Sequence, residues 1–504
     1  MAMREVLGGT AAAVLAVIAL AGCSGSVPPQ AEGAGHGGIG GGRQAAPTPP
    51  VSPDAVPLAT GAPRESGAVV AAGAPGAPYN YGPSVMSDDG TTRMWWCSQY
   101  PGAMPPGDDI LYAEAASPDG LFTGPGGAPA PAALSGNPGH FDGVHACDPS
   151  VIRVSGTYYM YYTGAAGDHA LGNSIGLATS TDGVTWQRAN DGRPIVDPAH
   201  DTHRDNVYGA GQPSAVYLDG WFYLMFTDTT GLAAGWNGAG QFVLRSTDPA
   251  FTHDVQALGE PGFAPVDTTS VPRTASLADA FSADLMWIDA LDAWAVAHET
   301  ADGTTITFWD RDFTRTPFRP VLLPGPWREG PGLVRQPNGH APVSATDPCG
   351  RVPLDVVRAT VTGEAGAPTD LRRFGLDLTE LDACADPARA LTVLDGFAMP
   401  SPVRTMDLVV AGQVVRVDRR SVARELADHV LDARLDVLDR YPVVARLESG
   451  TRALEADGLG VGFLLDDGRL YPVRNAAAVS ANGSATEQVT PEQWRDHPEG
   501  PALG

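Results

Sequence analysis

A phrase made of an apolar strand, a Gly/Asp turn and a strand with alternating aromatic residues recurs five times after Tyr79. The copies begin at Tyr81 (YGPSVMSDDGTTRMWWCSQY), Asp148 (DPSVIRVSGTYYMYYTG), Gln212 (QPSAVYLDGWFYLMFTD), Phe281 (FSADLMWIDALDAWAVAHE) and Glu329 (EGPGLVRQPNGHAPVSAT). Each copy has the pattern of a β-hairpin. A third strand follows each hairpin, beginning at Ile110, Ile175, Phe242, Ile306 and Leu371.

Repeats of about 50–70 residues, each with room for a fourth strand, predict an all-β fold, a five-bladed β-propeller over residues 79–395. One blade cannot bury both of its faces alone, so the repeats are expected to close into a ring. The alternative is a β-sandwich whose segments resemble one another by coincidence.

The repeat ends near Asp395, and a different pattern follows. Apolar residues at helical spacing behind a serine cap predict a helix over Ser421–Asp439, and strand-like stretches come after it. We therefore expect residues 396–504 to form a small α+β appendage, with participation in ring closure as the alternative.

The N-terminus has the features of an export signal. Residues Leu7–Leu20 are almost wholly apolar, follow a short segment with Arg4, and lead into Leu-Ala-Gly-Cys at 20–23. Such a run is too short to span a membrane and is typical of a signal peptide, and its end resembles a bacterial lipobox. We predict a signal peptide over 1–22, a lipidated Cys23 and an exported protein anchored on the outer face of the bacterial cytoplasmic membrane. An ordinary secretory signal is the alternative.

Residues 23–78 are rich in Gly, Pro and Ala and have almost no aromatic residues. A stretch of this composition buries too little apolar surface to fold, so it is predicted to be a linker.

Four cysteines remain once Cys23 is set aside: Cys97, Cys147, Cys349 and Cys384. An even number of cysteines in an exported chain indicates disulfides. Pairing by proximity in sequence predicts Cys97–Cys147 and Cys349–Cys384. Their spacing matches no zinc pattern, so no metal role is expected.

The charge and composition of the chain exclude several classes of function. The chain has 58 acidic and 32 basic residues, a formal charge of −26, and no lysine at all. The absence of lysine excludes Schiff-base chemistry, a lysine base and a P-loop. An acidic chain without a basic cluster does not suit nucleic acid. We expect no nucleic-acid partner, membrane contact only through the N-terminal lipid, and a monomer.

At CDPSVIRVSGTYYMYYTG, IGLATSTDGVTW and REGPGLV the sequence resembles the five-bladed propeller glycoside hydrolases, family 43 and its relatives. The resemblance covers about residues 79–385 and implies cleavage of arabinan, xylan or related neutral polysaccharides. By motif, Asp148 in Asp-Pro-Ser matches the general base, and Glu329 in Glu-Gly-Pro matches the general acid. Glu299 is the alternative acid. The family takes base and acid from its first and third blades, whereas here they begin the second and fifth repeats.

A third carboxylate in that family orients the other two. Asp205, Asp279 and Asp284 lie near the starts of inner strands, and Asp284 is our candidate for this role. Independently of the resemblance, glycosidic cleavage needs one protonated and one ionised carboxyl group. For the hydrolase that the resemblance implies, we expect an inverting mechanism, with the two groups roughly 6.5–9.5 Å apart.

Several other residues are expected to contact the sugar: Trp95, Trp96, Gln212, Asp205 and His145. No cofactor or metal is expected, although a structural cation in the funnel is compatible with the sequence. The rival hypothesis is a non-catalytic lipoprotein whose propeller binds glycan or a protein. A propeller glycoside phosphorylase is a third hypothesis, but it would need a cationic phosphate site, and no such Arg/His cluster stands out.

Overall fold

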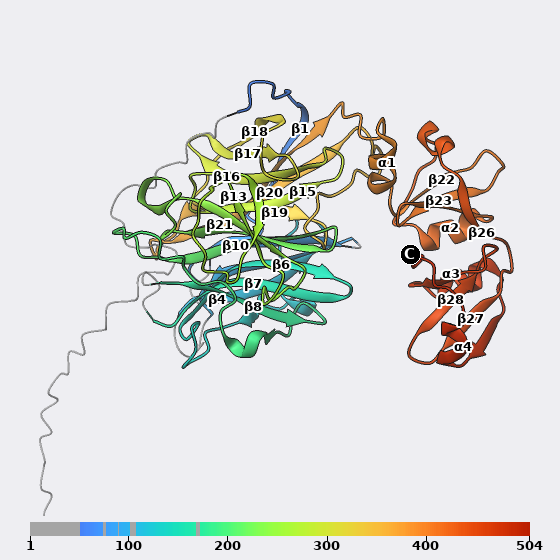
Figure 1. Ribbon diagram of the computed structural model, residues 1–504, viewed down its shortest axis with the longest axis horizontal. Coiled ribbons are helices and arrows are strands. Elements are labelled where there is room, and N and C mark those ends of the chain that lie inside the picture. The colour runs from blue at the N-terminus through green and yellow to red at the C-terminus, as the bar shows by residue number, and fades with distance from the viewer. Residues whose placement is uncertain (1–50, 74–76, 89, 101–106, 168–171) are drawn as a thin grey trace, which may run out of the picture. The chain divides into compact units, whose positions relative to one another are not determined.

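The computed structural model describes residues 51–73, 77–88, 90–100, 107–167 and 172–504 (Figure 1). The fold is all-β, a five-bladed β-propeller followed by a small α+β module. Among the described residues, no helix is long and apolar enough to cross a membrane. The signal peptide over 1–22 and Cys23 lie outside the described residues.

Each blade is an antiparallel sheet whose first strand is innermost. Blade 1 contains β2 (Asn80–Asp88), β3 (Thr91–Ser98), β4 (Asp109–Ala115) and β5 (Ala132–Leu134). Blade 2 contains β6 (His145–Val154), β7 (Thr157–Ala165), β8 (Ser174–Ser180) and β9 (Gln187–Arg188). Blade 3 contains β10 (Ala210–Leu218), β11 (Trp221–Asp228), β12 (Gln241–Ser246), β13 (Gln256–Gly259) and β14 (Gly262–Pro265). Blade 4 contains β15 (Ala283–Ile288), β16 (Ala293–Thr300), β17 (Gly303–Trp309) and β18 (Phe318–Pro324).

Blade 5 is completed by a strand from the other end of the chain. It contains β19 (Glu329–Arg335), β20 (Val352–Thr362), β21 (Pro368–Thr379) and β1 (Ala59–Glu65). β1 pairs antiparallel with β21, with Thr60 opposite Leu378. The linker prediction for residues 23–78 is therefore wrong for β1. Its sequence, ATGAPRE, lacks an apolar alternation, and it is held by backbone pairing to an existing sheet edge.

The inner strands lie side by side around a closed ring, from β2 through β6, β10, β15 and β19 back to β2. A serine or aspartate on one inner strand accepts a hydrogen bond from a backbone N–H on the next. The pairs are Ser84 with Val151 N, Ser150 with Ala215 N, Ser214 with Leu285 N, and Asp284 with Leu333 N, at 2.7–2.9 Å. Between blades 5 and 1, parallel pairing of β19 with β2 closes the ring.

Each blade packs against a neighbouring blade on each of its two faces. This packing explains why the second strand of the repeat carries so many aromatic residues. Trp95 in β3 is fully buried, its indole N–H donates to Gly183 O of blade 2 at 2.9 Å, and its ring meets Trp186 at 6.3 Å. A strand with a blade on either side buries both of its faces. The aromatic residues of the repeat therefore mainly fill the layers between blades.

The fifth repeat differs from its predicted hairpin. β19 begins at Glu329 as expected, but its antiparallel partner β20 begins only at Val352. The residues APVSAT from Ala341 are not its second strand. They belong to a long connection that carries Cys349, which forms the predicted disulfide with Cys384. The other predicted disulfide, Cys97–Cys147, joins β3 of blade 1 to β6 of blade 2.

The C-terminal module, drawn in orange to red in Figure 1, contains two sheets and short helices. The first sheet contains β22 (Phe397–Pro400), β23 (Met406–Val410), β24 (Gln413–Val417), β25 (His429–Val430) and β26 (Val443–Leu447). The second contains β27 (Ala453–Ala456), β28 (Gly460–Leu464), β29 (Leu470–Val473) and β30 (Thr486–Val489). The helices of this region are α1 (Pro387–Val393), α2 (Arg420–Leu426), α3 (Ala477–Asn482) and α4 (Pro491–Arg495).

The helix predicted over Ser421–Asp439 is wrong beyond α2. The chain leaves the helix after Leu426, and β25 pairs parallel with β22, with Val430 opposite Ala398. The later apolar residues of the predicted stripe lie at this sheet edge and in the 3-10 turn at Asp436–Arg440. Tertiary pairing has overridden a local helical pattern here.

Candidate active site

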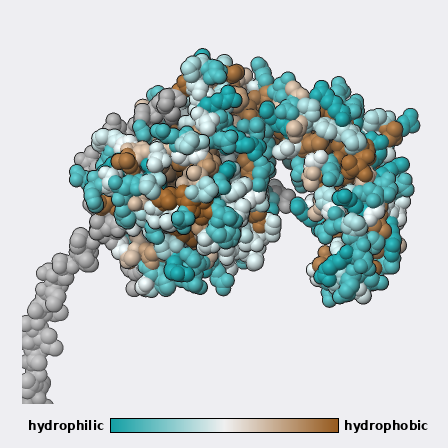
Figure 2. Space-filling model, viewed as in Figure 1, coloured by the Kyte–Doolittle hydropathy of each residue, from teal (hydrophilic) through white to brown (hydrophobic). Residues whose placement is uncertain are grey.

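A small pocket lies where the inner strands of all five blades begin, at what we call the mouth end of the ring. Its volume is about 40 Å³, room for a few ordered waters. Its lining comes from every blade: Gly82 and Pro83, Asp148 and Pro149, Gln212 and Pro213, Ser282 to Asp284, and Glu329 to Pro331. Figure 2 shows one face of the molecule, whose surface is mixed, with hydrophobic patches among hydrophilic residues.

The pocket wall is built by a repeated backbone bulge. Gly82, Asp148, Gln212 and Gly330 each precede a proline and have φ of 47–56°. At each of these points the pairing of the inner strand with its neighbour shifts register. Such bulges turn a side chain away from the regular strand direction, and here they line the pocket.

Asp148 is the carboxyl group that blade 2 contributes to this wall. Its side chain is half-buried, and the Tyr208 hydroxyl donates to its Oδ2 at 3.3 Å. Burial raises the pKa of Asp148 to about 7, and the nearby Asp108 carboxylate adds to this, while hydrogen bonds from Thr163 and Tyr208 oppose it. Asp148 therefore changes its protonation state near neutral pH.

Glu329 is the carboxyl group of blade 5, and it is also half-buried. Gln212 Nε2 donates to its Oε1 at 3.5 Å, and Ser282 Oγ donates to Gln212 Oε1 at 3.1 Å. This chain of contacts connects three blades across the pocket. The structure thus brings together Asp148, Glu329 and Gln212, as the sequence predicts.

Glycine keeps the space between the two carboxyl groups open. Blade 1 lies between blades 2 and 5, and its residue at the equivalent position is Gly82. A Cβ on Gly82 would lie 3.1 Å from Asp148 Oδ1, and one on Gly330 would lie 3.0 Å from the Gly82 Cα. A side chain at Gly82 would therefore occupy the gap beside Asp148.

Asp284 lines the pocket, but the protein itself engages both of its oxygens. Oδ1 accepts from Ser214 Oγ at 2.5 Å and lies 3.3 Å from Arg335 Nη1, while Oδ2 accepts from Leu333 N at 2.7 Å. These contacts hold three blades together. They favour a framework role for Asp284 over the orienting role that we predicted.

Arg335 fills the axis of the ring, and its side chain is only 2% exposed. It comes from blade 5, yet its guanidinium donates to Leu285 O of blade 4 at 2.9 Å and Ala215 O of blade 3 at 3.1 Å. The Nη2 group also lies within 3.4 Å of Ser84 and Ser150 of blades 1 and 2. A positive charge therefore lies on the axis of the ring, and a structural cation in the funnel stays a prediction.

Trp95 and Trp96 do not contact the pocket, so their predicted role in sugar binding is wrong. Both rings are buried, at 0% and 3% exposure, and the Trp96 indole N–H donates to Asn80 Oδ1 at 2.7 Å. Their alternation fits the repeat, but the blades on either side cover both faces of β3.

Two other predicted contacts also lie outside the pocket lining. His145 is buried, with Nδ1 3.0 Å from Asp108 Oδ2, and Tyr79 donates its hydroxyl to the same carboxylate. Asp205 is exposed on the segment that leads into β10. Their roles in sugar binding stay predictions.

The alternative acid, Glu299, lies elsewhere. It is buried in β16, accepts from Thr304 Oγ1 at 3.0 Å, and lies 3.9 Å from Arg358 Nη1. Burial raises its pKa to about 7, but it is not part of the pocket lining. The geometry therefore favours Glu329 over Glu299 as the acid.

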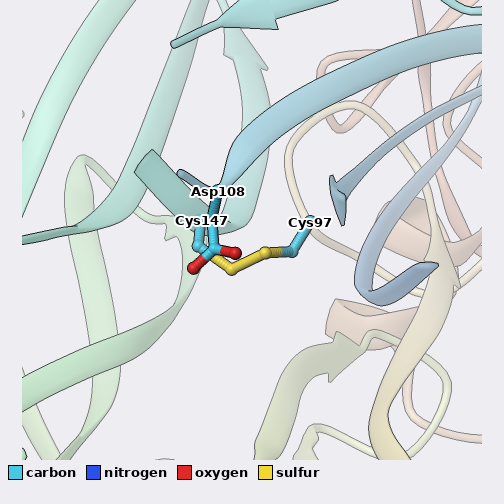
Figure 3. A group of neighbouring side chains, drawn as sticks. All are labelled: Cys97, Asp108 and Cys147. Carbon is cyan, nitrogen blue, oxygen red and sulfur yellow. A yellow bond between two sulfur atoms is a disulfide. The ribbon is translucent and has the colours of Figure 1, made fainter. Parts of the chain in front are cut away.

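Within the part of the chain that the structure describes, one buried group has the composition of a metal site: Cys97, Cys147 and Asp108 (Figure 3). The two sulfur atoms are bonded to each other, so neither is a thiolate that could bind a metal. The disulfide instead fixes the residue next to Asp148.

Sequence reasoning missed Tyr208, Ser282 and Arg335. Aligning all five repeats, and not only Asp148 and Glu329, would have identified the pocket positions, because Gly-Pro, Asp-Pro, Gln-Pro, Ser-Ala and Gly-Pro occupy equivalent places. Tyr208 lies in a loop and belongs to no motif. In the structure Gly211 leaves room for it, because a Cβ on Gly211 would lie 2.5 Å from the Tyr208 hydroxyl.

No protein-family model matches the chain, and no curated protein matches it by sequence. The similar solved structures include several glycoside hydrolases. A family 117 glycoside hydrolase from Zobellia galactanivorans has 11% identity and a TM-score of 0.41, over 65% of this chain and 92% of that one. The catalytic domain of a GH62 α-L-arabinofuranosidase from Coprinopsis cinerea has 12% identity and a TM-score of 0.39, over 63% and 97%. A glycosyl hydrolase from Bacteroides ovatus has 10% identity and a TM-score of 0.40, over 62% and 94%.

Proposed function

We propose that the protein is a glycoside hydrolase that cleaves furanosidic or xylosidic linkages of a neutral extracellular polysaccharide. The observation that carries this proposal is that Asp148 and Glu329 face one pocket from blades 2 and 5, with glycine between them. Two separately held carboxyl groups around a gap are the minimum for acid/base cleavage of a glycosidic bond.

In this proposal Asp148 is the general base and Glu329 the general acid. Ionised Asp148 removes a proton from a water molecule, which attacks the anomeric carbon while Glu329 protonates the departing oxygen. The pocket has room for such a water beside Asp148, and the Tyr208 hydroxyl orients the carboxylate through Oδ2. Because the pocket leaves room for the attacking water, we expect inversion at the anomeric carbon.

The direct test is release of sugar from aryl α-L-arabinofuranosides, aryl β-D-xylosides, arabinan, arabinoxylan and xylan. We expect Asp148→Asn and Glu329→Gln each to reduce kcat/KM by at least about 10³-fold in the folded protein. Azide restoring activity to Asp148→Asn, with inverted product, would support its role as base. Wild-type protein that releases nothing, or activity that survives both substitutions, would overturn the proposal. Glycan binding without turnover would favour the non-catalytic alternative.

The site of action is a separate proposal. We infer export and lipid anchoring from the apolar segment and Cys23, so the propeller would act outside the cytoplasmic membrane. Expression in a bacterium followed by fractionation tests this: the wild type should sediment with membranes, and Cys23→Ser should not. Equal distribution of the two proteins would contradict the lipid anchor.

A further inference from the structure

The loop between β11 and β12 exposes a large aromatic ring at the mouth end of blade 3. The register places Ala210 of β10, Asp228 of β11 and Gln241 of β12 at the same end of the blade, so the loop 229–240 lies at the end that carries the pocket. Trp236 in this loop is 63% exposed and Leu232 is 67% exposed. An exposed tryptophan offers a large aromatic face against which a ligand can pack.

The loop is fixed although its aromatic ring is exposed. Trp236 begins a 3-10 turn, Trp236–Gly238, whose Asn237 has a φ of 54°. Arg204 donates to Thr229 O, Gly231 O and Ala234 O at 2.8–3.1 Å. A ring held on a fixed backbone loses little conformational entropy when it binds a ligand.

Hydrogen bonds connect this turn to the carboxyl group of the pocket. Asn206 Nδ2 donates to Asn237 O at 2.9 Å, while Asn206 Oδ1 accepts from Tyr208 N at 3.1 Å. The Tyr208 hydroxyl in turn donates to Asp148. The exposed ring and Asp148 are thus held in one connected frame on the mouth side of blades 2 and 3.

The polar groups near the ring suit a sugar. Asp205 is exposed and precedes Asn206, and Asp279 approaches the backbone of the turn, where a Cβ on Gly235 would lie 2.6 Å from its carboxylate. A sugar ring has an apolar C–H face, which packs on an aromatic plane, and an edge of hydroxyl groups, which donate to carboxylates. The two carboxylates disfavour an anionic polymer at this place.

We propose that Trp236 is a platform for a sugar residue outside the pocket, on a neutral polysaccharide that is bound in the pocket, with Asp205 accepting hydrogen bonds from the hydroxyl groups of that residue. This inference rests on the proposed function and deepens it: the enzyme would recognise a sugar chain that extends beyond the residue bound in the pocket. Short substrates do not reach the platform, whereas polymers do.

The test compares polymer and small substrate in the full chain. For Trp236→Ala we expect kcat/KM on arabinan or arabinoxylan to fall about tenfold or more, with KM rising, while kcat/KM on the aryl glycoside stays within about twofold. Trp236→Phe should restore part of the loss. Leu121→Ala is the matched control, because Leu121 is 68% exposed beyond the far end of β4, away from the mouth. Equal effects on polymer and small substrate, or none on either, would overturn the platform.

A binding measurement separates this inference from the proposed function. Affinity electrophoresis in gels that contain arabinan, arabinoxylan or xylan, run with Asp148→Asn as background, measures binding without turnover. Retardation that Trp236→Ala abolishes and Leu121→Ala preserves would support the platform even if the wild type cleaves nothing. Retardation that Trp236→Ala leaves unchanged, or no retardation in any gel, would overturn it.

Discussion

The pocket makes Asp148 costly to the folded state at neutral and higher pH, so removing its charge should stabilise the protein. Burial raises the pKa of Asp148 from its ordinary 3.8 to about 7 in the folded chain. A carboxyl group with a raised pKa stabilises the fold while it is protonated, and this contribution is lost as the pH rises toward the folded pKa. Asparagine has a similar shape and does not ionise, so Asp148→Asn avoids the loss.

The magnitude follows from the shift. Between pH 5 and pH 7 wild-type Asp148 stays mostly protonated when folded and ionised when unfolded, and each pH unit costs about 1.4 kcal/mol. Two units set an upper limit of about 3 kcal/mol. Because the side chain is only half-buried and solvent screens part of the effect, we expect about 2 kcal/mol.

Guanidinium unfolding of wild type and Asp148→Asn at pH 5 and pH 8 measures this difference. The free energy gained by the variant should be larger at pH 8 than at pH 5 by about 2 kcal/mol. Glu299 also titrates near neutral pH, but it is present in both proteins and cancels. Asp191→Asn, at a side chain that is 92% exposed, should show no such dependence. A gain that is equal at both pH values, or larger at pH 5, would refute the claim that burial governs Asp148.

Three further predictions follow from the contacts around the pocket. In Gly82→Asn, asparagine tolerates the backbone φ of 55°, but its side chain would fill the gap beside Asp148. The variant should lower kcat/KM by about tenfold or more while thermal unfolding shows a folded protein. Unchanged activity would mean that the gap is not used. Asp108→Asn removes a charge that raises the pKa of Asp148, so the acidic limb of the kcat/KM profile should move to lower pH, and a limb that stays fixed or rises would contradict this. Arg335→Met leaves a buried carboxylate unpaired and should cost about 3–5 kcal/mol in chemical unfolding, with Asp284→Asn recovering part of the loss; additive effects would show that the pair is not coupled.

The repeat made the propeller predictable, because five hairpins of similar period leave few ways to bury their faces. β1 was not predictable, since its pairing with β21 uses backbone groups that any sequence carries. The prediction of a helix over Ser421–Asp439 was wrong for a different reason. An apolar residue such as Val430 fits the apolar face of a helix and the edge of a sheet equally well, so the sequence pattern does not distinguish them.

Pocket residues were predictable where a carboxyl side chain stands at the start of an inner strand, as at Asp148 and Glu329. Trp95 and Trp96 were not, because the alternation of a hairpin does not say whether each face meets solvent or another blade. Trp236 and Tyr208 lie in loops outside the repeated phrase, where neither period nor motif marks them. Only the folded chain brings these loops to the mouth end of the ring.

The bulges that line the pocket share one backbone conformation but carry side chains of different chemistry. Gln212 has a φ of 51° before Pro213, almost the same as the 47° of Asp148 before Pro149, yet its amide cannot exchange a proton in acid/base catalysis. The strained conformation is therefore a property of the repeated inner strand and not an adaptation to one reaction. Since Gly82, Asp148, Gln212 and Gly330 share this backbone, the place of the proposed base depends on which of these equivalent positions carries a carboxyl group. Moving the carboxyl group from blade 2 to blade 3, by Asp148→Gln with Gln212→Asp, should keep the fold and abolish cleavage, because the gap beside Gly82 would no longer face a base.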